Sequence, residues 1–262
     1  MRLFSHELAR SWAVFRDRWV TAVKVALLPF AALFLLLPYL VESAALREHA
    51  LQLPALDLAL LTPSLFTTVL AGGSLLAFFL ASIVAKAALY HAFSAPEDPG
   101  AARAYALALR RFPSFFITTV FTVGLVTLFI LAALAVFAYY RAFIRPTVLA
   151  DAASAGMDTF VILLTLLLLL PVYGVALLVT FAPLIALRGD ARGGISAVAA
   201  SIALVRSRFW SVAGRFTGWG ALFFALSAIV SPLPVAQWLL PSIATLVSYA
   251  FTVVLYEELR GA

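Results

Sequence analysis

Three basic residues of this 262-residue sequence, Lys24, Lys86 and Arg215, lie inside or at the edge of long apolar stretches. A charge placed in an apolar segment is costly and is therefore a functional-site hypothesis. Such a cation can bind an anion or a lipid headgroup, or its long side chain can reach the polar boundary of a membrane. Both interpretations stay open. Lys24 and Arg215 each follow a tryptophan by five residues, Trp19 and Trp210, which slightly favours a binding site.

One short pattern, an arginine before an aromatic residue at the start of an apolar run, occurs three times. The arginines are Arg18, Arg111 and Arg208, which lie 93 and 97 residues apart, and the aromatic residues are Trp19, Phe112 and Trp210. Arginine at a membrane surface can hold phosphate, and an aromatic ring marks the boundary between headgroups and lipid tails. These positions therefore predict lipid or anion contacts and interface anchors.

Residues that could support catalysis are sparse. The three histidines, His6, His49 and His91, lie in separate regions, and cysteine is absent. The sequence contains no His-Glu-x-x-His, Gly-x-Ser-x-Gly or phosphate-binding Gly-x-x-x-x-Gly-Lys pattern. We expect no catalytic site, no metal and no cofactor, and hence no enzyme. The carboxylates at the ends of the apolar runs give little support for proton-coupled transport.

The composition indicates the environment of these residues. Hydrophobic residues make up 65% of the chain, charged residues only 11%, and the mean hydropathy is +1.08. Soluble domains carry about 25% charged residues, so the sequence predicts an integral membrane protein. The net charge of +6 is better explained by membrane topology and anionic lipids than by nucleic acid.

Six apolar segments are long enough, at about 20 residues, to cross a membrane. They cover residues 19–41, 64–93, 114–140, 159–187, 210–230 and 235–256. Pro29 and Pro38 interrupt the first segment, and Pro171 and Pro183 predict a kink in the fourth. External segments are expected at about 42–63 and 141–158.

Lysine and arginine are distributed unevenly between the two sides that this topology creates. Fifteen of the 18 basic residues fall on the side of the membrane that holds both termini in this topology. Basic residues concentrate on the cytoplasmic side of membrane proteins. We therefore expect a multi-pass protein of the bacterial cytoplasmic membrane with both termini in the cytoplasm.

Each pair of apolar segments is preceded by a stretch with helical periodicity. In the first stretch, Phe4, Leu8, Trp12, Phe15 and Trp19 recur opposite Glu7, Arg10 and Asp17. Such amphipathic helices can lie among lipid headgroups, although they can also be connectors packed against the bundle. The sequence thus predicts one membrane domain, 1–262, built from three helical-hairpin repeats at 3–94, 100–188 and 194–262. Gly214 and Gly218 have the spacing of a helix-packing motif, within the chain or with a second copy.

Three sequence blocks carry a resemblance to a known group. They are Ala-Pro-Leu-Ile-Ala-Leu at 182–187, Ser-Ile-Ala-Leu-Val-Arg-Ser-Arg-Phe-Trp at 201–210, and Val-Leu-Tyr-Glu-Glu-Leu-Arg at 254–260. These blocks resemble a group of bacterial six-helix membrane proteins that includes the membrane domain attached to some glycerophosphoryl diester phosphodiesterases. The resemblance implies a membrane domain without hydrolysis, because the catalytic domain is separate and we expect no residues here to encode it.

Two functions follow as expectations. The first is a non-enzymatic accessory or interaction subunit that engages anionic lipid headgroups, a membrane-protein partner or a second copy of itself. The alternative is a transporter or lipid-moving permease with a cationic site between the repeats, lined by Lys24, Lys86 or Arg215.

Overall fold

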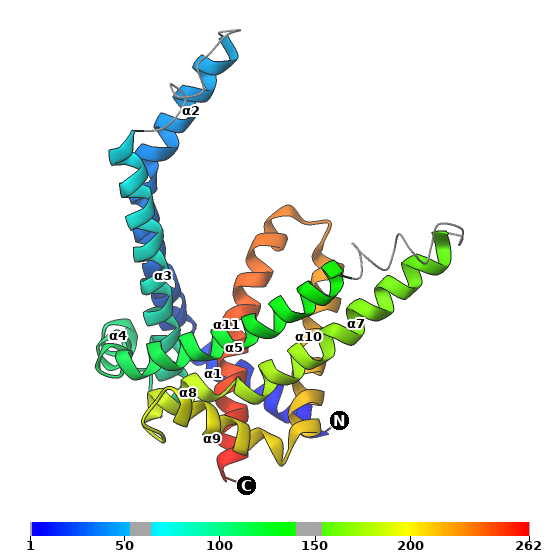
Figure 1. Cartoon of the computed structure of the whole chain (residues 1–262). Helices are drawn as coiled ribbons and strands as arrows, with labels where there is room; N and C mark the ends of the chain where they lie inside the picture. Colours follow the sequence, from blue (N-terminus) through cyan, green and yellow to red (C-terminus); the bar gives the residue numbers. More distant parts are fainter. Residues whose placement is uncertain (1, 53–63, 140–153, 262) are drawn as a thin grey trace. The chain divides into compact units, whose positions relative to one another are not determined.

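A computed structural model describes residues 2–52, 64–139 and 154–261, and these ranges contain helices and no strand (Figure 1). The predicted external segments fall partly on 53–63 and 140–153, which lie outside the described residues. The helices follow one another as α1 (Arg2–Leu27), the 3-10 helix η1 (Leu28–Leu36), α2 (Leu37–Gln52), α3 (Leu65–Ser94), α4 (Gly100–Arg110), α5 (Phe112–Tyr139), α7 (Ser154–Val179), α8 (Ala182–Arg188), α9 (Ile195–Arg206), α10 (Phe209–Val230) and α11 (Pro234–Gly261).

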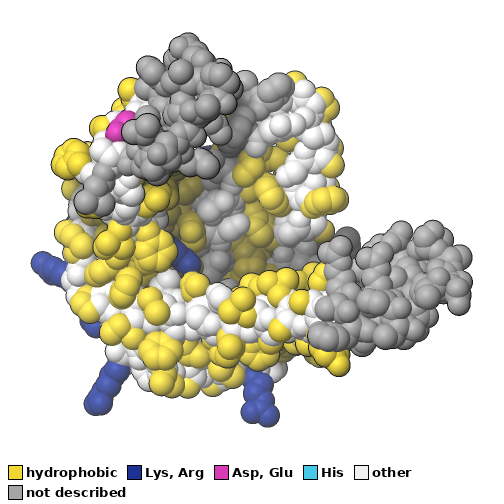
Figure 2. All heavy atoms as spheres, turned by 45° about the horizontal axis from the view of Figure 1, so that its top comes forward, with side chains coloured by type: hydrophobic (Ala, Val, Ile, Leu, Met, Phe, Trp, Pro, Cys, Tyr) yellow, Lys and Arg dark blue, Asp and Glu magenta, His cyan; other side chains and the backbone are white. Residues whose placement is uncertain are grey.

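Five helical stretches of the described chain are long and apolar enough to cross a membrane: α3, α5, α7 with α8, α10 and α11. A sixth candidate is the bent stretch 5–44, in which the helix direction changes by 47°. The prediction of an all-helical protein with several membrane-length helices is therefore confirmed. Figure 2 shows hydrophobic side chains over much of the surface in view, with Lys and Arg side chains projecting at its edges.

Prolines mark the irregular points of these spans, because proline cannot donate the backbone hydrogen bond of an interior helical residue. Pro29 lies in the first turn of η1, where α1 ends. The fourth span breaks at Thr180 and Phe181, and Pro183 occupies the first turn of α8. Pro171, in contrast, lies inside α7.

The described chain divides into two compact units. The first contains residues 2–11 and 111–261, the second contains 12–110, and the division within α1 falls after Ser11. The single-domain interpretation stays a prediction.

In the unit of residues 12–110, α3 packs against η1, α2 and α4. The Tyr105 hydroxyl of α4 donates a 2.7 Å hydrogen bond to the Val25 carbonyl. Burial raises the pKa of Tyr105 to about 12, so the phenol remains protonated at neutral pH and keeps donating. Thr21 donates to Asp98 at 2.9 Å and ties α1 to the loop before α4.

In the other unit, α5 packs against α7, α8 and α9, and α10 packs against α7, α9 and α11. The largest fully buried side chains include Phe115, Phe181 and Phe251. Phe216 contacts both Phe181 and Phe251 with ring centroids 6.4 and 5.5 Å apart. Aromatic packing therefore holds α8, α10 and α11 together.

The three segments expected to precede the hairpins are all helical, but they differ in form. α4 and α9 are separate helices, whereas the first segment runs without a break into its span as α1. The buried positions of these two helices are mostly small side chains, namely Ala104 and Ala108 in α4 and Ala197 and Ser201 in α9, together with Val205. Large apolar side chains on the same helices, such as Leu109 and Ile195, are exposed.

One detail of the predicted periodicity is wrong. The polar face of this helix is expected to be exposed, yet Glu7 is only 2% exposed, while Trp12 and Trp19 are 51% and 54% exposed. The reason is the ion pair of Glu7 with Arg215 on α10, described next.

Candidate functional site: an arginine–carboxylate cluster at the end of α11

Four carboxylates and four arginines meet at the C-terminal end of α11. This arginine–carboxylate cluster consists of Glu7, Arg10, Arg188, Asp190, Arg215, Glu257, Glu258 and Arg260. All eight residues belong to the unit of residues 2–11 and 111–261. They come from the N-terminal part of α1, the end of α8 with its following loop, α10, and the last turns of α11.

The most deeply buried part contains two carboxylates and one guanidinium. Arg215 Nη1 lies 2.7 Å from Glu7 Oε1, and Arg215 Nη2 lies 3.2 Å from Glu258 Oε1. The side chains of Glu7, Arg215 and Glu258 are 3%, 13% and 34% exposed. Glu7 and Glu258 also hydrogen-bond each other, so the two carboxyls share one proton, and the remaining negative charge pairs with Arg215. Breaking a buried ion pair is costly, so each group depends on the others.

The neighbouring part has the opposite balance. Glu257 accepts hydrogen bonds from Arg188 at 2.7 Å and from Arg10 at 3.3 Å. The Arg188 guanidinium also lies over the Tyr256 ring, 5.2 Å from its centroid. Two arginines share one carboxylate here, and the shorter contact belongs to Arg188. Arg10 consequently keeps unused hydrogen-bonding capacity.

The last part ties α11 to the loop after α8. Asp190 Oδ1 lies 3.0 Å from Arg260 Nη2, and the Tyr256 hydroxyl donates a 2.6 Å hydrogen bond to Asp190 Oδ2. Tyr256, Glu257, Glu258 and Arg260 are thus all engaged. They belong to the block at 254–260 that carries the family resemblance.

A cavity of about 250 Å³ opens beside the cluster and is lined by His6, Glu7, Arg10, Val254 and Glu258. The lining comes from one face of α1 and one face of α11. Glu7 makes the ion pair with Arg215 through Oε1 and hydrogen-bonds the Glu258 carboxyl. Charged groups and an open cavity thus lie together at this place.

Arg18, Arg111 and Arg208 lie at equivalent places, each at the C-terminal end of a later helix. Arg18 donates to the Ala92, Phe93 and Ala95 carbonyls at 2.5–2.7 Å, at the end of α3. Arg208 donates to the Leu259 carbonyl of α11 at 3.3 Å. The last carbonyls of a helix lack intrahelical partners and carry partial negative charge, so an arginine there stabilises the helix end.

Arg111 occupies the corresponding place at the end of α8. Its guanidinium lies 3.0–3.2 Å from where a Cβ of Gly189 would stand. Gly189 ends α8 with φ +80°, a conformation that favours glycine. A side chain at position 189 would therefore displace Arg111 as well as strain the backbone.

The three intramembrane cations have different surroundings. Lys24 is exposed, and Lys86 is half-buried with its ammonium 6.0 Å from the centre of the Tyr90 ring. Both belong to the unit of residues 12–110, whereas Arg215 belongs to the other unit. Of the three, Arg215 is the one that the structure places in the cluster.

The predicted interface anchors differ in exposure. Trp19 and Trp210 are 54% and 84% exposed, and Phe112 is half-buried. At Gly214 a Cβ would meet nothing within 4 Å, so no described side chain or other helix packs closely on that glycine. The helix-packing role of Gly214 and Gly218 stays a prediction.

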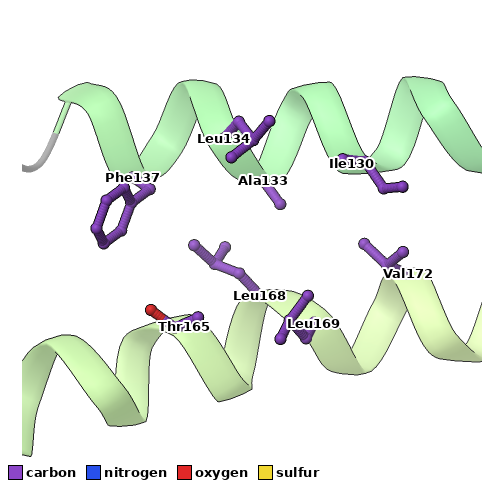
Figure 3. A pocket seen from close by; sticks show the side chains of 8 residues that line it. All are labelled: Ile130, Ala133, Leu134, Phe137, Thr165, Leu168, Leu169 and Val172. Carbon is purple, nitrogen blue, oxygen red and sulfur yellow. The ribbon is translucent and has the colours of Figure 1, made fainter. Parts of the chain in front are cut away.

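An apolar groove of about 190 Å³ lies between α5 and α7 (Figure 3). Ile130, Ala133, Leu134 and Phe137 of α5 face Thr165, Leu168, Leu169 and Val172 of α7. The Thr165 hydroxyl is the one polar side-chain group of this lining, so the groove offers hydrophobic contact and no charge.

Sequence reasoning missed most of the cluster. It selected Arg215 but neither of its partners, Glu7 and Glu258, and it did not select Glu257. A usable signal existed, because acidic residues are few, 12 in 262, and two of them are adjacent at the end of an apolar run. Within the ranges that the structure describes, no group of three His, Cys, Asp or Glu residues is arranged to hold a metal.

The sequence matches no protein-family model, no curated protein and no solved structure at a significant level. The resemblance to a group of six-helix membrane proteins therefore stays a prediction.

Proposed function

We propose that the protein is a non-enzymatic, six-span accessory protein of the bacterial cytoplasmic membrane that engages anionic lipid headgroups. The observation that carries this proposal is that some arginines form ion pairs with described carboxylates, whereas others are exposed and form none. In the unit of residues 2–11 and 111–261, the ion pairs found among described residues use Arg10, Arg188, Arg215 and Arg260.

Arg111, Arg192 and Arg206 are exposed and have no ion pair with a described residue. They lie at the start of α5, before α9 and at the end of α9. Uncompensated positive charge beside exposed apolar residues, such as Trp210, suits a surface of anionic headgroups. Exposed Leu109 and Ile195 support the same placement of α4 and α9 in the headgroup region.

The ion pair between Arg10 and Glu257 supports the count of six crossings. Arg10 lies near the start of the bent stretch 5–44, Glu257 lies near the end of the last membrane-length helix, and the two side chains are 3.3 Å apart. Two residues in contact at one membrane surface require an even number of crossings between them. The bent stretch 5–44 would then be a full span, with both chain ends on the same side.

Three hairpin repeats are part of the proposal. Arg18, Arg111 and Arg208 each reach the C-terminal end of the helix that closes their own hairpin: α3, α8 and α11. Equivalent contacts at equivalent positions favour an internal repeat over coincidence.

The test measures lipid retention after reconstitution in nanodiscs of mixed phosphatidylglycerol and phosphatidylcholine. We expect the unaltered protein to enrich phosphatidylglycerol around itself. The double change Arg192→Gln and Arg206→Gln should reduce that enrichment about fivefold for each arginine, since one basic residue near the surface contributes about 1 kcal/mol. The matched change of both residues to lysine preserves charge and should preserve enrichment. Equal retention by all three proteins would contradict the proposal.

A transporter or permease is the second candidate, and the cavity beside Arg215 is the observation that favours it. A transporter exposes its site alternately to the two sides. Cysteine introduced at Val254 would then become accessible to a membrane-impermeant thiol reagent from either side in turn. Access from one side only would exclude this alternative.

A further inference from the structure

We propose that the cavity between α1 and α11 binds a small zwitterion that carries one primary ammonium group and one phosphate or carboxylate group. This inference is independent of the anionic-lipid contacts proposed above, which use other residues. It rests on the charges that line the cavity and on the burial of Glu7.

The ammonium half follows from Glu7 and Glu258. Both carboxylates line the cavity, and both contact the same guanidinium, that of Arg215. The Glu7 and Glu258 carboxyls hydrogen-bond each other, so they share one proton, and Arg215 pairs with the single negative charge that remains. Glu7 is only 2% exposed, so water gives little stabilisation to a second negative charge. A primary ammonium brings a positive charge and N–H donors, so it can take the place of the shared proton and let both carboxyls ionise.

The anionic half follows from Arg10 and His6, which line the cavity beside the carboxylates. Arg10 shares Glu257 with Arg188, and its contact is the longer of the two, 3.3 Å against 2.7 Å. One positive charge is left over in this group of three residues. An arginine with spare donors is well suited to phosphate or carboxylate.

The size of the cavity limits the ligand. Sites for drug-sized molecules have about 300–1,000 Å³, so about 250 Å³ suits a headgroup-sized molecule with a few non-hydrogen atoms. Two sources have this chemistry: a soluble zwitterion such as phosphoethanolamine, and the headgroup of phosphatidylethanolamine.

The first experiment measures binding to the purified full-length protein by calorimetry. Phosphoethanolamine should bind saturably. Phosphocholine, ethanolamine and inorganic phosphate should each bind at least about tenfold more weakly. The quaternary nitrogen of phosphocholine has no N–H donor, and each of the other two satisfies only one half of the site.

The second experiment distinguishes the lipid source. The protein is reconstituted with equal amounts of phosphatidylethanolamine and phosphatidylcholine, and the lipids that remain bound are measured by native mass spectrometry. Preference for phosphatidylethanolamine without phosphoethanolamine binding assigns the site to a lipid headgroup. The reverse result assigns it to a soluble zwitterion. No preference in either assay overturns the proposal.

Variants connect binding to the cavity. Glu258→Gln and Arg10→Gln should each weaken binding about tenfold, whereas Arg260→Gln, which removes an ion pair of the same cluster outside the cavity, should leave it unchanged. Unchanged binding in the first two variants would place the ligand elsewhere and overturn the proposal. If either variant fails to fold, equal binding of phosphoethanolamine and phosphocholine to the unaltered protein overturns it.

Discussion

At the scale of single residues, the N-terminal helix reverses the usual relation between chemical type and burial. Glu7 is buried, while Trp12 and Trp19 on the same helix are more than half exposed. In lipid surroundings an exposed tryptophan has a favourable environment, and a carboxylate is best placed beside a guanidinium inside the protein. Arg215 provides that guanidinium.

Changing Arg215 to glutamine should therefore destabilise the protein strongly. It leaves Glu7 buried without its charged partner, which costs about 3–5 kcal/mol of unfolding free energy. Denaturant unfolding in detergent micelles measures the effect. The control is Lys24→Gln, which removes the exposed cation that follows Trp19 by five residues, as Arg215 follows Trp210, and should change stability by less than about 0.5 kcal/mol. Equal effects of the two changes would contradict the role of the cluster.

Changing Arg18 to glutamine should weaken the end of α3. Its guanidinium donates to carbonyls of the last turn, and hydrogen bonds from a charged group contribute about 1.5–3 kcal/mol. Hydrogen exchange should accelerate at the amides near Ala92. Arg16→Gln is the control, because Arg16 pairs only with exposed Asp17 and such a pair contributes at most about 1 kcal/mol. Faster exchange in both variants would indicate general destabilisation of the protein and not a local effect at the end of α3.

At the scale of elements, the loop between α8 and α9 fixes α5 through a tight glycine contact. Gly193 has φ +96°, and a Cβ there would overlap the Ser114 hydroxyl at the start of α5. The Gly194 amide also donates to Thr118 on α5 at 2.7 Å. The loop between α8 and α9 therefore packs closely on the first turns of α5 and holds that helix in place.

Gly193→Ala should cost about 1–3 kcal/mol, because it combines an unfavourable backbone conformation with a steric overlap. Gly214→Ala is the matched control: this glycine lies within α10, has open space, and should gain up to about 1 kcal/mol from helix propensity. Thermal unfolding measures both. A loss at position 214, together with a shift from dimer to monomer, would instead indicate that a second copy packs at Gly214 and Gly218.

At the scale of the whole molecule, the number of crossings determines which loops share a side. The sequence contains no cysteine, so each introduced cysteine is a unique label. With six crossings, Ala9→Cys and Ser207→Cys should react with an impermeant reagent from the same side and Ser231→Cys from the other. With five crossings, Ala9→Cys would share its side with Ser231→Cys. Labelling of intact cells and of inverted vesicles separates these outcomes.

Span lengths were predictable because a span needs an apolar length that matches the membrane thickness. The stretch 5–44, which contains Pro29 and Pro38, changes direction by 47° between Phe34 and Leu37. The cluster was not predictable, since Arg10 and Glu257 are separated by 247 positions and no local spacing links them. Periodicity also misplaced Glu7, because the method assumes that the polar face of a helix is the exposed one. That assumption fails for Glu7 because its carboxyl is buried against Arg215.

The 247-residue separation of Arg10 and Glu257 determines when the two side chains can meet during synthesis. Arg10 leaves the ribosome 247 residues before Glu257, and at about 5–20 residues per second this interval is about 12–50 s. Glu258 follows Glu257 directly, so the carboxylates and arginines around the cavity come together only after α11 has emerged. The segment before Ser11 must therefore remain available for these contacts until α11 has emerged.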